Sequence, residues 1–286
     1  MSLRINTNIS AMNAYRNLSV NDKSLQGSLE KLSSGLRINR AADDAAGLSV
    51  SQGLQSQIGG LQVAARNAQD GINVVQTADG ALAESGAILQ RMRDLAVQAS
   101  NGGSQDTNAQ AAADTEFQQL NKELDRIVST AKFGSQQLLG GGYNGSFQVD
   151  SGTGTGSTIA VDMTSATGAL NGLTITGLDS AGLATGAADL KTTATATAAI
   201  NTLDTAIKDM STVRANLGAL QNRFEHTINS INVSVENLSA SKSAITDTDM
   251  ASEMVKFTKN QILQQAGTAM LAQANAAPQS VLKLLG

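Results

Sequence analysis

The residues that could take part in chemistry are few and widely spaced in this chain. Its one histidine, His226, stands in the run Arg-Phe-Glu-His, and there is no cysteine, so the usual donors cannot complete a set of metal ligands. Asp43 and Asp44 are adjacent. Neighbouring side chains on a helix point about 100° apart, which suits helix capping better than a paired acid and base. We therefore predict no catalytic site, no metal site and no cofactor.

The run from Gly152 to Gly156 resembles part of a phosphate-binding loop. It lacks the lysine and the following helix that such a loop uses, so we interpret it as a turn. The surrounding residues 134–189 hold no His, Glu, Cys, Lys or Arg, and their only ionisable side chains are Tyr143 and four aspartates. An enzyme inserted in the middle of the chain is therefore the least favoured alternative.

The composition favours thin helical bundles over a compact globular core. The chain has 286 residues, but aromatic residues are only 2% and tryptophan is absent, so smaller apolar side chains must do the packing. The net charge of -4 and the absence of a basic cluster with interleaved aromatics argue against nucleic acid as a partner. There is no long apolar run, so we expect no membrane span. The polar start, MSLRINTNIS, predicts no Sec-type signal peptide, so export would need another route.

The stretch from Leu54 to Leu89 predicts the plan of the chain. Its apolar or small residues follow one another at steps of four and three: Leu54, Ile58, Leu61, Ala65, Ala68, Ile72, Val75, Leu82 and Leu89. Asp79 and Gly86 take two positions of the same repeat, which is the a and d pattern of a heptad. A helix over residues 45–99 would be roughly 80 Å long, and so narrow an apolar stripe needs partner helices along it.

Residues 1–44 predict a first helix that ends in a polar break. Thr7 or Asn8 could cap this helix. Its seam is a series of leucines: Leu18, Leu25, Leu29, Leu32 and Leu36. After the break, Asp43 or Asp44 is the expected cap of the long helix, because a carboxylate also suits the positive end of the helix dipole.

Residues 101–189 predict a change from helix to strand. After a turn at residues 101–104, a helix at about 107–132 should fold back on the long helix, since a short loop favours antiparallel neighbours. Beyond it the apolar pattern changes to period two. Short strands are expected at residues 147–149, 159–163 and 173–176, although so glycine-rich a segment would also suit disorder.

The last third of the chain mirrors the first. A helix of about 50 residues should begin near Asp189, with a heptad-like seam in which Arg214 takes one position. A polar break at residues 241–249 separates it from a final helix at residues 250–276, which should end at Pro278.

These elements predict a mainly α fold of long antiparallel helical rods with a small β-hairpin-rich middle. The two terminal helices have sparse seams that bury little area, so they should gain order only by packing with copies of the chain or with another partner. This pattern is typical of self-assembly. The leucine series of the first helix belongs to these candidate contacts, and so do three residues of the last helix: Met254, Phe257 and Ile262.

Five glycines lie inside the long helix and weaken it. They are Gly59, Gly60, Gly71, Gly80 and Gly86. Each costs about 0.5–1 kcal/mol relative to alanine. A poor helix is one interpretation. We favour the other, in which backbones of neighbouring helices approach closely there, because the heptad continues through these positions.

Several long stretches resemble bacterial flagellin. In the first half these are MSLRINTNISAMNAYRNL, SLEKLSSGLRINRAADDAAGLSVS, ARNAQDGINVVQTADGALAE and LQRMRDLAVQASNG. In the second half they are VRANLGALQNRFEHTI, DTDMASEMVKFTKNQILQQAGTAMLAQAN and PQSVLKLL. The resemblance covers about residues 1–140 and 195–286. The chain departs from the usual flagellin pattern at Ala276-Ala277-Pro278 and at the final Gly286, which affects only the terminal packing.

The resemblance implies a subunit of the bacterial flagellar filament, the motility propeller. Its domains would be a terminal coiled coil called D0 at 1–44 and 245–286, a helical rod called D1 at 45–133 and 190–244, and a short variable β-rich region at 134–189. The subunit would be exported unfolded through the flagellar type III apparatus and would act outside the cell as a homopolymer. Implied partners are an export chaperone on the C-terminal helix, the filament cap and hook-junction proteins.

The segment Leu89–Leu95 also resembles the flagellin site read by the vertebrate Toll-like receptor for flagellin. Gln90, Arg91 and Leu95 match that site, with Glu116 as a companion on the next helix. These residues could instead make contacts between subunits, and one surface could do both. The alternative for the whole chain is a junction protein of the same appendage, which would form a short ring or patch rather than a long filament.

Overall fold

The computed structural model describes residues 8–103, 106–140, 142–163, 180, 185–186 and 188–285, with side chains as far as residue 276. It divides into two compact units. The terminal unit comprises Met1–Ser56 and Glu236–Gly286, and the central unit comprises Gln57–Val235. Two long helices, α2 (Ala45–Ala99) and α4 (Thr193–Thr246), contribute to both units.

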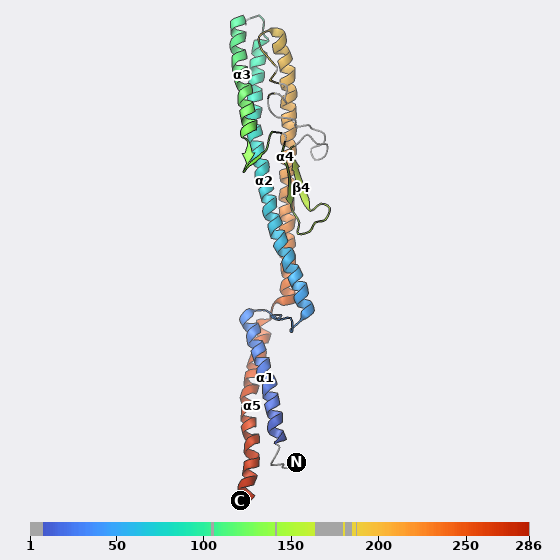
Figure 1. Ribbon diagram of the computed structural model, residues 1–286, viewed down its shortest axis with the longest axis vertical. Coiled ribbons are helices and arrows are strands. Elements are labelled where there is room, and N and C mark those ends of the chain that lie inside the picture. Colours follow the sequence, from blue (N-terminus) through green and yellow to red (C-terminus); the bar gives the residue numbers. More distant parts are fainter. Residues whose placement is uncertain are drawn as a thin grey trace. The chain divides into compact units, whose positions relative to one another are not determined.

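The terminal unit is built on α1 (Ile9–Ser34) and α5 (Met250–Leu285), which run antiparallel and pack along each other (Figure 1). The helix ends at Leu285, so the predicted end at Pro278 is wrong. Proline has no N–H to donate to the carbonyl of Ala274, four residues earlier. Asn8 Nδ2 donates to that carbonyl at 2.8 Å and so supplies the hydrogen bond that the proline removes.

Each of the five described helices begins with a side-chain cap. The caps are Asn8 for α1, Asp44 for α2, Asp106 for α3 (Thr107–Thr130), Thr192 for α4 and Asp249 for α5. Each side-chain oxygen accepts a hydrogen bond from a backbone N–H of the first turn, where no helical carbonyl is available. Polar residues at these positions therefore set where each helix starts.

In the central unit α2, α3 and α4 pack around one hydrophobic core (Figure 1). The largest fully buried side chains come from all three helices and include Leu82, Leu89, Met92, Phe117, Leu124, Leu203 and Phe224. The predicted helices at residues 45–99 and 107–132 and the long helix after residue 189 are thereby confirmed.

The seam of α2 differs from the predicted one in one of its two columns. One column is buried as predicted: Leu61, Ala68, Val75, Leu82 and Leu89. The second buried column lies three positions after each of these and consists mostly of small residues: Ala64, Gly71, Ala78, Ser85, Met92 and Ala99. In the predicted second column Ile58 and Ile72 are buried as predicted, whereas Ala65, Asp79 and Gly86 lie half-buried at the margin of the seam.

Two of the five helix glycines are closely packed, although by a side chain and a loop residue rather than by the backbone of a neighbouring helix. A Cβ at Gly71 would lie 2.6 Å from the ring of Phe224, and one at Gly60 would lie 2.8 Å from Cβ of Ser151. At Gly59, Gly80 and Gly86 a Cβ would meet nothing within 4 Å among the described residues. For those three glycines, close contact with neighbouring copies stays a prediction.

Two ion pairs join the margins of α2 and α4 in the central unit. Arg214 Nε lies 2.8 Å from Asp79 Oδ1, and Arg93 Nε lies 2.5 Å from Asp204 Oδ1. Asp79 and Arg214 are the residues that interrupt the apolar repeats of their respective helices. The two interruptions therefore face each other across the helix pair.

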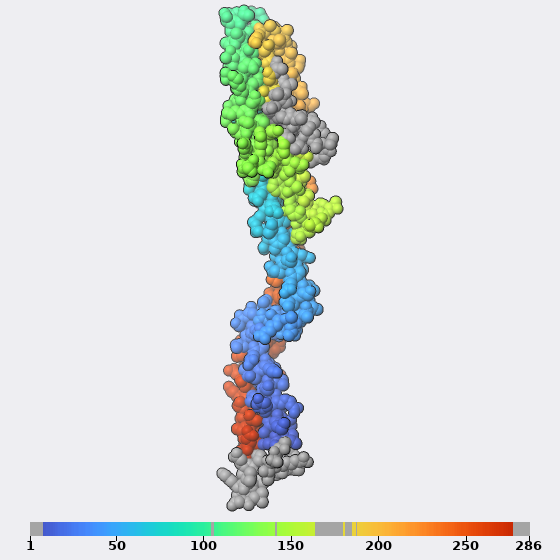
Figure 2. Space-filling model, viewed as in Figure 1, coloured from blue at the N-terminus to red at the C-terminus, as the bar shows by residue number. Residues whose placement is uncertain are grey.

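Two antiparallel hairpins follow α3. A short one joins β1 (Lys132–Phe133) to β2 (Gln136–Gln137), and a longer one joins β3 (Asn144–Gln148) to β4 (Thr158–Asp162), with Phe147 opposite Ile159. The strands expected near residues 147–149 and 159–163 are confirmed, and the one expected at residues 173–176 lies outside the described residues. The Phe147 ring meets the Phe224 ring edge-on, with centroids 5.7 Å apart, so the longer hairpin is anchored on α4. Its loop projects from the central unit (Figure 2).

Polar side chains of α3 hold the segment that leads into α4. Asp114 Oδ1 accepts from Leu190 N at 2.9 Å, and Asn121 Nδ2 donates to the carbonyl of Thr185 at 3.2 Å. These groups are nearly fully buried, so the hydrogen bonds satisfy backbone atoms that water cannot reach. No described helix is both long and apolar enough to cross a membrane.

Candidate assembly surface

The contact between α1 and α5 is polar for a helix pair. Asn21 Nδ2 donates to the carbonyl of Asn260 at 2.7 Å, and Gln264 Nε2 donates to Asp22 Oδ1 at 3.1 Å. The α5 residues with the least exposure recur at steps of three and four: Glu253, Phe257, Asn260, Gln264, Gly267, Leu271 and Ala274. Only two of these seven are large and apolar. The face that α5 turns toward α1 is therefore held mainly by hydrogen bonds and small residues.

Eleven large apolar residues of the two helices are nevertheless exposed to solvent. On α1 they are Ile9, Met12, Tyr15, Val20 and Leu29, and on α5 they are Met250, Met254, Val255, Ile262, Leu263 and Met270. Each is between 47% and 70% exposed. We call these eleven residues the outer apolar face. On α5 part of it forms a shallow groove of about 500 Å³, lined by residues that include Met254, Val255 and Ile262.

On α5 this distribution reverses the usual one, because apolar side chains normally turn toward the partner helix and polar ones toward water. Figure 2 shows the two terminal helices side by side, each with its other side open. A contiguous exposed apolar surface on a soluble protein marks a place where another molecule binds. The terminal unit therefore carries an apolar surface that nothing within the described chain covers.

The predicted assembly residues divide between the two sides of this helix pair. Leu18, Leu25, Leu32 and Leu36 are half-buried, whereas Leu29 is exposed. On α5, Phe257 is half-buried, and Met254 and Ile262 lie on the outer apolar face.

Sequence reasoning missed most of the outer apolar face, including Val255 and Leu263. It assumed that the larger residues fill the seam. The signal that could have found the seam is a seven-residue repeat of small or polar residues: Ala14, Asn21, Ser28 and Gly35 on α1, and Glu253, Asn260, Gly267 and Ala274 on α5.

The two halves of the chain are tied together where α1 ends and α5 begins. Gly35, at φ 73°, closes α1 in the left-handed conformation that favours glycine. Leu36 then pairs with Asp247 in a short antiparallel bridge. In this bridge Arg37 N donates to Thr246 O at 2.6 Å, and Thr248 N donates to Gly35 O at 2.9 Å.

The two adjacent aspartates have separate structural roles. Asp43 Oδ2 accepts from Arg40 N at 2.9 Å and from Asn39 N at 3.0 Å, and these bonds hold the pKa of Asp43 below its ordinary value. Asp44 Oδ1 accepts from Gly47 N at 2.9 Å and caps α2. Neither arrangement positions the two carboxyl groups as an acid and base pair.

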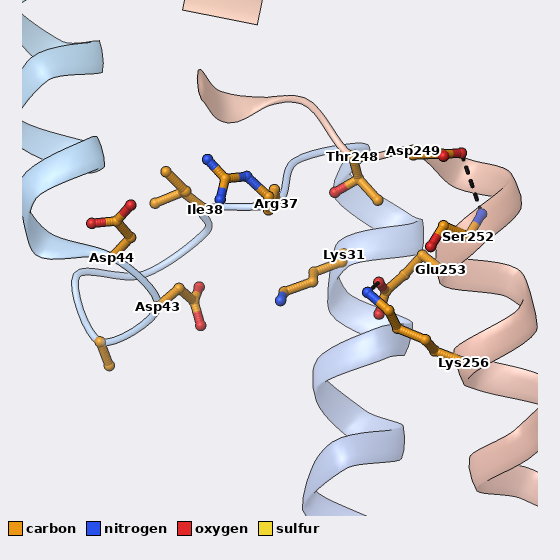
Figure 3. Close-up of a pocket in the computed structure, with 11 residues that line it drawn as sticks. Lys31, Arg37, Ile38, Asp43, Asp44, Thr248, Asp249, Ser252, Glu253 and Lys256 are labelled. Atoms are coloured by element: carbon orange, nitrogen blue, oxygen red, sulfur yellow. Dashed lines mark hydrogen bonds and ion pairs between the residues drawn. The ribbon is translucent and has the colours of Figure 1, made fainter. Parts of the chain in front are cut away.

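A polar cavity of about 550 Å³ lies beside this bridge (Figure 3). Lys31 extends from α1 toward Asp43, and Glu253 and Lys256 lie on the facing helix. Burial works to raise the pKa of Glu253, but hydrogen bonds from Ser28 and Lys256 outweigh it, so the pKa is lowered. Side chains of both signs line the cavity, so its charge favours no single class of ligand.

The residues resembling a receptor site lie on the central unit. Arg91 Nη2 lies 2.7 Å from Glu116 Oε1, which joins α2 to α3, and Gln90 is exposed. Leu95 is only 3% exposed, so it packs beneath the surface rather than lying on it. Arg91 and Glu116 thus lie together where α2 meets α3. Gln90 instead lines a shallow hollow on the α4 side of α2, with Ile207 and Arg214.

The chemistry-bearing residues of the sequence do not gather into a site. His226 is exposed on α4. Among the described residues no group of three His, Cys, Asp or Glu side chains could hold a metal ion. The terminal unit instead presents exposed apolar side chains on α1 and α5.

Long helices with an uncovered apolar face define the chain as a structural protein that assembles with other chains. The family model for the bacterial flagellin N-terminal helical region matches residues 5–144, and the model for the C-terminal helical region matches residues 200–285. The chain belongs to the bacterial flagellin family. It is therefore a structural subunit that polymerises into the flagellar filament, and it is not an enzyme.

Full-length relatives agree with the family match. The flagellin of Halalkalibacterium halodurans is 48% identical over 284 residues, which cover 98% of this chain and 99% of that protein. The flagellin of Bacillus subtilis is 46% identical over 305 residues, which cover 99% of this chain and 100% of that protein. Both are flagellins rather than junction proteins, which disfavours the junction alternative.

A solved structure shares the fold. It is described as a flagellar hook-associated protein from Vibrio parahaemolyticus and covers 72% of this chain and 100% of its own, with a TM-score of 0.56. At 13% sequence identity this likeness shows the fold alone.

Proposed function

We propose that α1 and α5 make the contacts that hold neighbouring subunits together in the filament. The observation that supports this is the outer apolar face, which is exposed to solvent on the two helices. Burying a fully exposed side chain of this kind is worth about 1.5–3 kcal/mol, and these eleven are about half exposed, so each could contribute roughly half of that to polymerisation. Residues 1–44 and 245–286 would then act as the terminal coiled coil D0, residues 45–133 and 190–244 as the rod D1, and residues 134–189 as the variable part.

Ile262→Glu tests this proposal. Ile262 is 60% exposed, so the change should leave the monomer folded. In the polymer it would place a charge in an apolar contact. We expect the critical concentration for polymerisation, measured by sedimentation, to rise roughly tenfold or more. Ile262→Leu is the matched control and should polymerise like the wild type. A Glu variant that polymerises at the wild-type concentration would show that this face is not an interface.

The outer apolar face of α5 is also where we propose that a flagellar export chaperone binds before secretion. An exposed apolar helix would allow subunits to polymerise inside the cell before export. A chaperone that covers this helix would prevent that. Titration of the chain with such a chaperone should give binding that Ile262→Glu weakens and Ile262→Leu preserves. Equal affinity for the two variants would place the chaperone elsewhere.

We further propose export through the flagellar type III apparatus to an extracellular filament that contacts cap and hook-junction proteins. The support is the membership of the flagellin family. A strain that lacks the export apparatus should retain the chain inside the cell, whereas a strain that lacks only the cap should release it as monomer. Secretion without the apparatus would contradict the proposal.

For the Toll-like receptor we propose Gln90, Arg91 and Glu116 as the contacting surface, with Leu95 packed beneath it. The support is the sequence resemblance together with the exposure of the Arg91–Glu116 pair and of Gln90. Arg91→Ala should weaken receptor activation by purified monomer. Arg126→Ala, which removes a comparably exposed arginine paired with Glu123 on α3, is the matched control. Equal activation by the two variants would remove this surface from consideration.

A further inference from the structure

The methionines of this chain fall into two groups according to the unit that holds them. In the central unit Met92, Met163 and Met210 are at most 2% exposed. In the terminal unit the four described methionines are exposed by 47% to 64%: Met12, Met250, Met254 and Met270. We call these four the outer methionines, and all of them belong to the outer apolar face.

We propose that the outer methionines are sites of oxidation by hydrogen peroxide and related peroxides, and that their oxidation stops the subunit from polymerising. The proposal rests on the proposed role of the outer apolar face in assembly. Susceptibility of a thioether to peroxide follows its exposure, so of the seven methionines that the structure describes the free subunit offers four for reaction and keeps three in its core.

The chemistry is a two-electron oxygen transfer. The thioether sulfur donates an electron pair to one oxygen of the peroxide, an S–O bond forms and the O–O bond breaks. The other oxygen leaves as hydroxide and takes up a proton to give water. The sulfur is oxidised by two electrons, the peroxide is reduced by two, and the product is methionine sulfoxide.

The consequence follows from where the sulfurs lie. Met254 lines the groove on α5 beside Val255 and Ile262. A sulfoxide there carries a strong hydrogen-bond acceptor that water satisfies in the free subunit. In an apolar contact between subunits this acceptor would be buried without a donor. The modification therefore opposes the assembled state and leaves the core of the central unit untouched.

Assembly should in turn protect these residues. If the outer apolar face is covered by neighbouring subunits, peroxide reaches its sulfurs only before polymerisation. Oxidation would then act on subunits in transit and spare the finished filament.

The first test compares sites within the free subunit. Purified full-length monomer is treated with hydrogen peroxide, quenched with catalase and digested, and the mass gain of one oxygen atom is followed at each methionine. We expect the four outer methionines to react well before Met92, Met163 and Met210. Equal rates in the two groups would overturn the proposal.

The second test measures assembly. Oxidised wild type should need a critical concentration roughly tenfold or more above that of untreated protein. The variant Met12→Leu/Met250→Leu/Met254→Leu/Met270→Leu keeps apolar side chains of similar volume but has no sulfur to oxidise at these positions, so peroxide should not raise its critical concentration above the value of the same variant before treatment. Oxidised wild type that polymerises normally, or a leucine variant that peroxide still blocks, would overturn the proposal.

Two further measurements keep the outcome decisive. If the leucine variant does not polymerise at all, oxidised wild type is treated with methionine sulfoxide reductases A and B. Restored polymerisation would support the proposal, and polymerisation that stays lost would overturn it. In filaments formed before treatment the outer methionines should be oxidised more slowly than in monomers. Equal oxidation rates in filaments and monomers would show that assembly does not protect these residues. Untreated protein that fails to polymerise would instead refute the proposed function, independently of the site preference.

Discussion

Two glycines of the same helix should respond in opposite directions to the same change. At Gly71 a Cβ would lie 2.6 Å from the ring of Phe224, which is fully buried and held edge-on against Phe147. The ring cannot move aside cheaply, so Gly71→Ala should introduce overpacking of about 1–3 kcal/mol. At Gly80 a Cβ would meet nothing within 4 Å, so Gly80→Ala has no such cost.

The comparison separates packing from helix propensity. Both substitutions gain about 0.5–1 kcal/mol because alanine is the better helix former. That gain cancels in the difference between the variants, which leaves the overpacking alone. We therefore expect Gly80→Ala to be slightly more stable than wild type, and Gly71→Ala to be about 1–3 kcal/mol less stable than Gly80→Ala.

Scanning calorimetry of the three full-length monomers provides the measurement. For a unit of this size 1 kcal/mol shifts the melting temperature by about 2–4 °C, so the two variants should differ by several degrees in the transition of the central unit. If Gly71→Ala melts at the same temperature as Gly80→Ala, α2 and Phe224 are not in close contact and the explanation of this glycine is wrong.

Three further predictions concern hydrogen bonds and carboxylates. Asn8→Asp should keep the cap of α1 but lose the donor to Ala274 O, so circular dichroism melting should show that the terminal unit is less stable by about 1 kcal/mol. Asn8→Ala loses the cap as well and should be less stable still. If neither variant loses stability, the hydrogen bond from Asn8 does not compensate for the one that Pro278 removes. Asp114→Ala should cost about 1–3 kcal/mol in urea unfolding, because the buried N–H of Leu190 loses its acceptor, and an unchanged midpoint would contradict this. Stability of the terminal unit should be level above about pH 5 and decline below it. Carboxyl groups whose pKa is lowered by folding stabilise the folded state above their ordinary pKa, and this stabilisation is lost as pH falls through their pKa in the folded state. A melting temperature that stays level down to about pH 3 would refute the prediction. These carboxyl groups are Asp43, Asp247 and Glu253.

The helices could be predicted from the sequence because their apolar repeats are long. The column from Leu61 to Leu89 was identified correctly, since a seven-residue step of large residues has one interpretation. In the second column Ile58 and Ile72 are buried as predicted, but Ala65, Asp79 and Gly86 lie one position after the buried residues Ala64, Ala78 and Ser85. Ala64, Ala78 and Ser85 are as small as the residues beside them, so hydrophobicity alone cannot tell which of two adjacent small columns faces the neighbouring helix.

The terminal unit could be predicted in its role but not in its geometry. Sparse seams indicated that α1 and α5 need additional partners. They did not indicate which side faces the helix partner, because the usual rule places Ile262 and Met254 inward. The rule that large apolar residues face inward applies to burial in the final assembly. Within one chain, the positions of α5 that face α1 are held by hydrogen-bonding residues such as Asn260 and Gln264.

The charged residues that interrupt the apolar repeats of α2 and α4 were the least predictable feature. Each is explained only by its ion pair with the charged residue on the other helix. Asp79 interrupts α2 and Arg214 interrupts α4, and they pair across the bundle. Exposed pairs of this kind contribute only about 0–1 kcal/mol each, so stability does not explain them. The second pair, Arg93 with Asp204, has the opposite polarity, with the base on α2. A slide of α4 that brought Arg214 toward Arg93 would set like charges against each other. We infer that the two pairs fix the register of a helix pair whose small, repetitive seam would otherwise allow it to slip.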